Sequence, residues 1–322
     1  IKKNNFENID LVIVNFYPFE KTLEKTKNHN KILENIDIGG PSLIRAAAKN
    51  YNDVTVITSS NNYNDLIEQL KKYSGSTTLE FRKKMSQQAF AETAYYDSLI
   101  ANYFNKITNI NFPAKKISHY SLLERLRYGE NPHQKAAIYS QDRTHRINKI
   151  HGKSLSYNNY NDIFSALAIS KSFPKNIGVV ILKHATPCGV SVIKHNLKSY
   201  RAALACDPIS AFGGIVSCNF KITKNIATEL RKIFLEVIIA NGFEENALKI
   251  LKQKKNLRLI DASDFLLNEN IKINSFNNSF LIQQEDNKIF SKNNFKVVSR
   301  KRPNKSQFEN LIFAFNVCRY AK

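Results

Sequence analysis

Cysteine is scarce in this sequence, and its spacing excludes two common kinds of site. The 322 residues contain four cysteines, one methionine and no tryptophan. No cysteine forms a CxxC pair or accompanies an HxxxH string, so the sequence signals neither a zinc knuckle nor a disulfide framework. We therefore expect no metal and a reducing, cytoplasmic compartment, the cytosol. The four residues are Cys188, Cys206, Cys218 and Cys318.

Long apolar runs are also missing. No run approaches the roughly 20 residues that span a bilayer, so we expect no membrane contact. The first residues, Ile1-Lys2-Lys3, include neither a methionine nor a signal peptide, and a fragment of a longer chain is one interpretation. The low contents of glycine (10) and proline (8) exclude collagenous and low-complexity classes.

Acidic residues are outnumbered by basic ones. The 48 Lys and Arg against 27 Asp and Glu give a formal net charge of +21, which favours a polyanionic partner. A codon pool biased toward A and T explains the same composition, because Lys and Asn fill the polar positions and Ile and Phe the apolar ones. No window holds the dense basic block of a nucleic-acid tail. We expect no nucleic acid partner, and a basic nucleic-acid-binding module stays the second hypothesis.

The length and a hydrophobic content of 43% suffice for about two domains. In the first half, strand and helix alternate, which predicts a parallel sheet with helical cover. A polar stretch at residues 106–120 marks a boundary, so we place the domains at 1–118 and 119–322. The strands are expected at 9–16 and 54–59, both buried on both faces, and the helices at 39–49 and 78–104.

The second half also predicts an α/β domain. Apolar, β-branched segments recur there between helical stretches, and the chain ends in a helix at 305–320. The expected strands lie at 136–139, 178–182, 213–218, 237–240, 257–261, 280–283 and 295–298.

Two polar clusters stand out in the first half. Asp37 precedes a Gly-Gly-Pro-Ser helix start, where backbone N–H groups and the macrodipole favour an anion, and Lys49 on that helix is a candidate for proton transfer. A capped helix with a solvated basic face explains the same residues. Asn15 and Tyr17 follow the first strand, at the carboxyl end where open parallel sheets bind ligands. Tyr17 is equally interpretable as a core aromatic before a turn proline.

Three clusters stand out in the second half. Residues 127–134 place Arg127 and Tyr128 in an irregular polar loop, and residues 156–159 repeat that theme. Lys183 beside His184 favours the neutral imidazole that acts as a base, and Lys183 itself suits a developing negative charge. Phe212 precedes a Gly-Gly pair and is placed to stack on a flat ring. A hydrated loop, a structural histidine and turn packing remain the alternatives.

Taken together, these strings resemble one family, the bifunctional purine biosynthesis enzyme that combines AICAR transformylase with IMP cyclohydrolase. The matching strings, in the family's order, are VNFYPF, ENIDIGGPSLIRAAAKN, LRYGENPHQ, LSYNN, KHATPCGV, DPISAFGGIV and EVIIA. The resemblance covers essentially the whole chain. It implies that further segments of the enzyme precede Ile1 and follow Lys322.

The resemblance implies a fold and a set of roles. The fold is a Rossmann-like (methylglyoxal-synthase-like) parallel sheet domain, followed by a cytidine-deaminase-like α/β domain without zinc. Tyr17, Asp37 and Lys49 resemble the cyclohydrolase catalytic residues, and His184 and Lys183 the formyl-transfer base and its oxyanion partner. The implied nucleotide contacts are Val14, Asn15 and Ile38 for IMP, and Arg127, Tyr128, Phe212, Gly213 and Glu236 for AICAR.

The resemblance also implies the ligands. They are the nucleotides AICAR, FAICAR and IMP and the cosubstrate 10-formyltetrahydrofolate, bound by a homodimer. The sequence departs from the usual family pattern at Phe16, Thr186 and Glu236, which bears on fine specificity. A degenerate, non-catalytic remnant of the enzyme is a third hypothesis, against which the intact Lys49, Lys183 and His184 argue.

Overall fold

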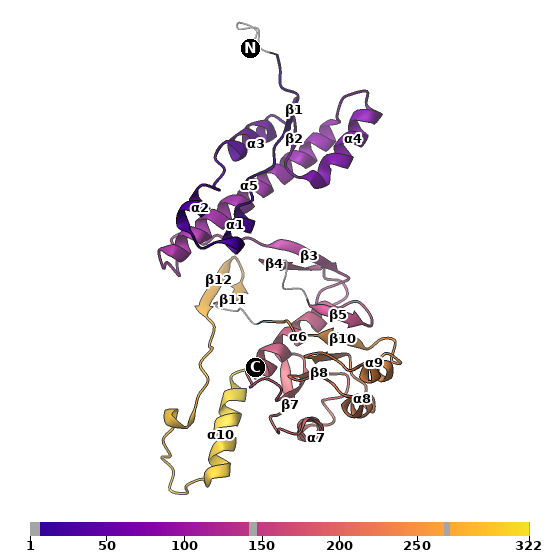
Figure 1. The fold of residues 1–322 in the computed structure, drawn as a ribbon, viewed down its shortest axis with the longest axis vertical. Coiled ribbons are helices and arrows are strands. Elements are labelled where there is room, and N and C mark those ends of the chain that lie inside the picture. The colour runs from indigo at the N-terminus through magenta and orange to yellow at the C-terminus, as the bar shows by residue number, and fades with distance from the viewer. Residues whose placement is uncertain (1–6, 142–146, 267–270, 322) are drawn as a thin grey trace. The chain divides into compact units, whose positions relative to one another are not determined.

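The computed structural model describes residues 7–141, 147–266 and 271–321. The chain divides into two compact units, Ile1–Tyr120 and Ser121–Lys322. Both contain helices and strands (Figure 1). None of the helices in the described ranges combines the length and the apolar composition that crossing a bilayer requires.

The first unit is built on a short parallel sheet and a long helix. β1 (Leu11–Ile13) pairs with β2 (Thr55–Ile57) in parallel. α3 (Gly39–Lys49), α4 (Tyr63–Lys72) and α5 (Leu79–Ile107) enclose one apolar cluster with β2. A second cluster joins α5 to α1 (Phe19–Lys25) and α2 (His29–Leu33). The short 3-10 helix η2 (Ser60–Asn62) leads from β2 toward α4.

The predicted helices at 39–49 and 78–104 are confirmed, and so is the strand at 54–59, shortened to β2. The prediction for residues 9–16 is only partly right. Three of these residues form a strand, and Leu11 and Ile13 are exposed, so burial on both faces is wrong for β1. Among the described residues β1 pairs with β2 alone, which leaves its outward positions uncovered.

The second unit contains a mixed six-stranded sheet in the order β5-β10-β9-β8-β6-β7. β8, β9 and β10 run parallel, whereas β6 is antiparallel to both β8 and β7, and β5 is antiparallel to β10. The strands are β5 (Asn148–His151), β6 (Val179–Lys183), β7 (Thr186–Ser191), β8 (Ile215–Cys218), β9 (Val237–Ala240) and β10 (Arg258–Asp261).

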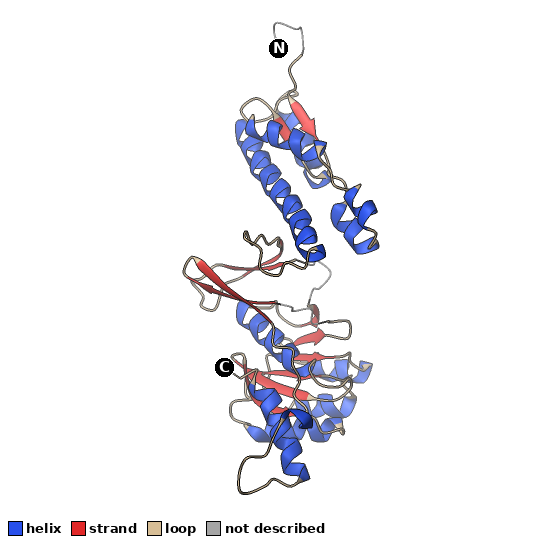
Figure 2. Cartoon of the chain, turned by 90° about the vertical axis from the view of Figure 1, so that its left-hand side faces the viewer, coloured by secondary structure: helices blue, strands red, loops and turns tan. Residues whose placement is uncertain are grey.

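Helices cover both faces of this sheet, giving three layers (Figure 2). α6 (Tyr157–Ser170) packs on one face, against apolar side chains of β6, β8, β9 and β10. α7 (Asn196–Cys206), α8 (Lys224–Leu230) and α9 (Glu245–Leu251) pack on the other. The central strands are buried on both faces, as their continuous apolar sequences predict.

The remaining elements of this unit lie outside the central sheet. Two hairpins stand as separate two-stranded sheets, β3 (Ser121–Leu126) with β4 (Ala136–Ser140), and β11 (Ile271–Phe276) with β12 (Ser279–Gln284). The 3-10 helix η3 (Lys292–Asn294) and α10 (Lys305–Cys318) follow. The strand predicted at 295–298 is wrong: those residues form no strand and pair with none in the described chain.

Candidate active site

A cavity of about 630 Å³ opens at one end of the strands of the six-stranded sheet. Seven of the residues singled out in the second half of the sequence line it, although they lie as much as 109 positions apart. These are Arg127, Tyr128, Lys183, His184, Phe212, Gly213 and Glu236. The structure therefore gathers every candidate of the second unit into one site.

The antiparallel strand β6 explains why these residues meet. Its carboxyl end carries Lys183 and pairs with β8 so that Leu182 lies opposite Ile215, the first residue of β8. The cavity thus lies at the carboxyl end of β6 but at the amino ends of β8, β9 and β10. The rule that open sheets bind ligands at strand carboxyl ends does not describe this site.

At the opposite ends of the same strands, the polar side chains form a hydrogen-bonded network. The Lys171 ammonium donates hydrogen bonds to Asn241 Oδ1 and to the Ala262 carbonyl, both at 2.8 Å. Asn241 in turn donates to Asn219. Burial lowers the pKa of Lys171, and the neighbouring Lys175 acts in the same direction. The carboxyl ends of β8, β9 and β10 are therefore held by internal hydrogen bonds.

Lys183 and His184 sit where β6 turns into β7. The Lys183 ammonium donates a 2.9 Å hydrogen bond to the Phe212 carbonyl, which ties the end of β6 to the turn before β8. His184 is exposed at the turn itself. A proton acceptor and a cation thus stand side by side at the cavity wall, the pair that a proton transfer with a developing negative charge requires.

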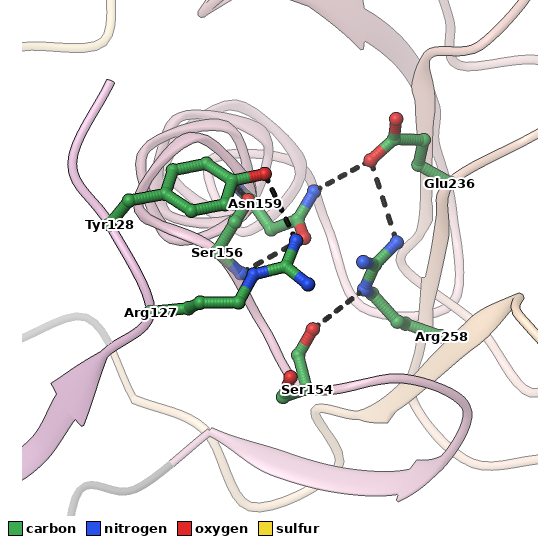
Figure 3. A network of polar contacts seen from close by, with 7 residues as sticks. All are labelled: Arg127, Tyr128, Ser154, Ser156, Asn159, Glu236 and Arg258. Carbon is green, nitrogen blue, oxygen red and sulfur yellow. Dashed lines mark hydrogen bonds and ion pairs between the residues drawn. The ribbon is translucent and has the colours of Figure 1, made fainter. Parts of the chain in front are cut away.

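Glu236 anchors a polar network across the cavity (Figure 3). Its carboxylate accepts a 2.9 Å hydrogen bond from the Asn159 side chain and lies 3.5 Å from an Arg258 guanidinium nitrogen. Arg258 also donates to the Ser154 carbonyl at 3.1 Å. Asn159 is buried and forms a capping box with Ser156 at the start of α6. Because Asn159 and Arg258 hold it, the carboxylate has a fixed position.

Arg127 and Tyr128 face this network from the segment after β3 (Figure 3). The Arg127 guanidinium lies 4.8 Å from the centre of the Tyr128 ring and donates to its hydroxyl at 3.1 Å. The loop closes on itself, because Gly129 N–H donates to the Gln134 carbonyl at 2.7 Å. Arg127 thus presents a stacked guanidinium, a group suited to phosphate or carboxylate.

Phe212 and Phe234 form an apolar wall. Their ring centres lie 5.4 Å apart, and Phe212 is 58% exposed. Gly213 has a φ of +73° and donates its N–H to the Phe234 carbonyl at 2.9 Å. The left-handed backbone at Gly213 favours glycine there, and it leaves the Phe212 ring free to stack on a planar ligand.

Sequence reasoning missed several residues of the cavity wall. The polar residues at 156–159 were noticed, but Asn159 was not singled out, and nothing in the sequence distinguished Arg258 from other arginines. Asp162 on α6 was missed as well. The further lining residues are Lys153, Ser154, Leu155, Ser156, Asn158, Ile215 and Phe234.

In the first unit, Asp37 and Tyr17 are brought together. The Asp37 carboxylate accepts hydrogen bonds from the backbone N–H of Gly40 at 2.8 Å and of Tyr17 at 3.4 Å. Asp37 thus caps the start of α3, while the Tyr17 side chain is 56% exposed. Asn15, just after β1, donates to the hydroxyl of Tyr63, the first residue of α4, at 3.0 Å. Asn15 and Tyr17 thus follow the carboxyl end of β1, while their partners Tyr63 and Asp37 come from the starts of α4 and α3.

Lys49 lies apart from that group. It is the last residue of α3, ten residues after Gly39, which places it about 15 Å along the helix axis. Among the described residues it makes no hydrogen bond or ion pair with Asp37 or Tyr17. Lys49 is exposed, whereas Ala47 and Ala48 beside it pack in the apolar cluster that includes α5.

The other two predicted contacts of this unit differ in burial. Val14 packs against the apolar cluster and extends the ladder by donating its N–H to the Ile57 carbonyl at 3.0 Å. Ile38 is 74% exposed, immediately before α3. An exposed isoleucine beside a helix start is available to a ligand.

Comparison with known proteins decides the family. A family model described as the AICARFT/IMPCHase bienzyme matches residues 47–322. The chain belongs to this family. The resemblance drawn from the sequence strings is thereby confirmed. A solved structure titled "Crystal structure of ForH" is 26% identical over 32% of this chain and 54% of that chain, with a TM-score of 0.29.

Relatives of the bienzyme family match the chain along its whole length. The bifunctional purine biosynthesis protein PurH of Thermoanaerobacter sp. (strain X514) is 42% identical over 327 residues, which is 64% of its own length. PurH of Prochlorococcus marinus (strain MIT 9515) is 41% identical, with 64% covered, and that of Bradyrhizobium diazoefficiens 40%, with 62% covered. The chain thus spans less than two thirds of the curated relatives it matches.

Proposed function

We propose that the cavity of the second unit transfers a formyl group from 10-formyltetrahydrofolate to the amine of AICAR, giving FAICAR. The observation that carries this proposal is the gathering of the seven candidate residues around one cavity. The relatives are bifunctional purine biosynthesis proteins, which supports the same reaction.

In this reaction His184 accepts the proton of the AICAR amine as its nitrogen attacks the formyl carbon. A new C–N bond forms, the bond from the formyl carbon to folate nitrogen breaks, and that nitrogen takes up a proton. Lys183, held by the Phe212 carbonyl, faces the oxygen on which negative charge develops. Glu236 and Arg127 hold the nucleotide by a carboxylate and a guanidinium, and Phe212 stacks on its base.

We further propose that the first unit closes the ring of FAICAR to IMP with loss of water. Lys49 handles a proton, while Asp37 and Tyr17 orient polar groups of the nucleotide near Val14, Asn15 and Ile38. The hydrogen bond that joins Tyr17 to Asp37 supports this grouping. The 15 Å along α3 requires the nucleotide to bridge from Asp37 to Lys49, since these two side chains do not meet directly.

The proposal includes the finer fold and the setting. The parallel β1–β2 pair is consistent with a methylglyoxal-synthase-like domain at 1–118, and the mixed sheet with a cytidine-deaminase-like domain without zinc at 119–322. We place both steps in the cytosol and in a homodimer, as the family resemblance implies.

A binding titration of the 322-residue chain tests the proposal. AICAR should bind by isothermal titration calorimetry, and Arg127→Ala should weaken binding at least about tenfold, because it removes the stacked guanidinium from the cavity. Arg125→Ala is the matched control, since Arg125 is exposed on β3 and does not line the cavity. Equal loss in both variants, or binding of a DNA oligonucleotide in place of AICAR, would overturn the assignment of the cavity.

A further inference from the structure

The turn that carries His184 has an unusual backbone. β6 and β7 are joined by only two residues, His184 and Ala185, with Lys183 paired to Thr186 across the hairpin. Both turn residues lie in the left-handed region, with φ of +52° and +57°. Glycine, asparagine and aspartate are the usual residues of such a turn, and others cost on the order of 1 kcal/mol each. The surrounding structure must therefore hold this turn in place.

Asp162 supplies that support from α6. Its Oδ1 accepts a 2.8 Å hydrogen bond from the N–H of Ala185, a residue that is itself buried. Asp162 also lines the cavity beside His184. One carboxylate therefore contacts the backbone of the strained turn and faces the same space as the imidazole.

The carboxylate is kept there against a desolvation penalty. Burial raises the pKa of Asp162, and hydrogen bonding from the Ala185 backbone, the electrostatic interaction with His184 and hydrogen bonding from the His184 backbone offset this only in part. The negative charge of Glu236 adds to the rise. An asparagine would accept the same hydrogen bond from Ala185 with no charge to bury. The negative charge itself therefore requires an explanation.

We propose that Asp162 is a positioning residue for His184, which fixes the β6–β7 turn through Ala185 and supplies the negative charge that stabilises the imidazolium formed when His184 takes up the proton. This inference rests on the proposed formyl transfer. It assigns to Asp162 no contact with the reacting atoms.

Other titratable groups lie near His184 as well. Lys183 precedes it on β6, and Glu236, just before β9, lines the same cavity. Cys188 lies on β7, and burial raises the pKa of its thiol, which keeps it neutral. Arg127, Lys153 and Arg258 line the same cavity, so the cations outnumber the two carboxylates around the imidazole. In such a surrounding a protonated imidazole depends strongly on the nearest carboxylate.

Two substitutions separate the two roles of Asp162. Asp162→Asn keeps the acceptor for Ala185 but removes the charge, and Asp162→Ala removes both. For Asp162→Asn we expect kcat of formyl transfer to fall about 10- to 100-fold with little change in KM for AICAR, and the acidic limb of the pH profile to move to lower pH. In Asp162→Ala, kcat should be lower still, and the melting temperature should also be lower than that of the wild type. Asn161→Ala, an exposed neighbour on α6, is the control.

Stability gives a readout that needs no activity. Because burial raises the pKa of Asp162, the folded state binds its proton more readily than the unfolded chain does. The wild-type chain therefore loses stability relative to Asp162→Asn as the pH rises from the unfolded pKa through the raised folded pKa. We expect Asp162→Asn to melt at or above the wild-type temperature at pH 7, with a smaller advantage at pH 4.

The titration of His184, followed by NMR of the 322-residue chain labelled at histidine, decides the electrostatic part. His184→Ala assigns the resonance, and Asp162→Asn should move the midpoint of the His184 titration to lower pH. An unchanged midpoint, or wild-type kinetics in Asp162→Asn, overturns the inference. If the wild-type enzyme transfers no formyl group to AICAR, the proposed function fails, while the NMR comparison still decides whether Asp162 supports the imidazolium.

Discussion

At the scale of single residues, two buried tyrosines differ in whether their hydroxyl group is hydrogen-bonded. Tyr200 on α7 is buried and its hydroxyl has no hydrogen-bond partner among the described residues; burial raises its pKa to about 12. Tyr96 on α5 is also buried, but its hydroxyl accepts from the Asp37 N–H at 2.8 Å and donates to the Asn35 carbonyl at 3.2 Å.

Replacement by phenylalanine should therefore change the free energy of unfolding in opposite directions at the two sites. Tyr200→Phe removes an unsatisfied hydroxyl and should stabilise the second unit by about 1 kcal/mol, whereas Tyr96→Phe should cost the first unit about 1 to 2 kcal/mol. Urea denaturation of both variants measures this. Destabilisation by Tyr200→Phe comparable to that of Tyr96→Phe would show that the Tyr200 hydroxyl has a partner in solution.

Single substitutions should also impair one of the two proposed reactions without the other. His184→Ala should lower formyl transfer at least about 100-fold and leave ring closure nearly intact, because it removes only the proton acceptor of the second unit. Lys49→Ala should do the reverse. Steady-state assays with AICAR and with FAICAR distinguish them, and an equal loss of both activities in either variant would contradict the two-site assignment.

At the scale of elements, the start of α3 shows why two adjacent glycines differ. A methyl group added at Gly40 would lie 2.9 Å from the carboxylate carbon of Asp37, whereas one added at Gly39 meets nothing within 4 Å. Gly40 therefore leaves room for the side chain that caps the helix. Its neighbour has no such constraint.

Alanine at these two positions tests the cap. Gly40→Ala should displace Asp37 and destabilise the first unit by about 1 to 2 kcal/mol, while Gly39→Ala should be neutral or stabilise by about 0.5 kcal/mol through helix propensity. Thermal unfolding of the pair gives the comparison. Ring closure should fall in Gly40→Ala alone, since Asp37 is one of its proposed groups; equal behaviour of the two variants would argue against the cap.

The success of sequence reasoning about these elements follows from local signals. Residues 39–49 and 79–107 combine capping residues with helical periodicity, and the buried strands of the second unit are continuous apolar runs. β7 was missed because its sequence, TPCGVS, includes Pro187 and Gly189, which ordinarily interrupt strands. Gly189 is needed there because a side chain would collide with the Ala203 carbonyl on α7, a contact that only the fold determines.

At the scale of the whole molecule, the cavity belongs to one unit. All its lining residues fall between Arg127 and Arg258, inside Ser121–Lys322, and this unit has apolar clusters of its own. Seven of these residues were singled out from the sequence, by local clusters and by the family resemblance, yet their meeting depends on the antiparallel direction of β6. Asp162 and Arg258 carried no signal of their own, because their role exists only through partners far away in the sequence.

This organisation predicts that residues 121–322 fold and bind AICAR without the first unit. We expect a cooperative melting transition and a dissociation constant within about threefold of the full chain's, since no lining residue is removed. Calorimetry on the separately expressed segment measures both. A folded segment that no longer binds AICAR would show that the first unit contributes to the site.

The two-residue connection between β6 and β7 has a consequence for protein engineering. One residue inserted into this hairpin would change the turn type and with it the left-handed backbone that presents His184. Residues 184 and 185 are therefore poor places for loop grafting or for length variation in a library. Residues 127–134 form a longer irregular loop whose first two residues line the same cavity, and variants of altered ligand preference are better sought there.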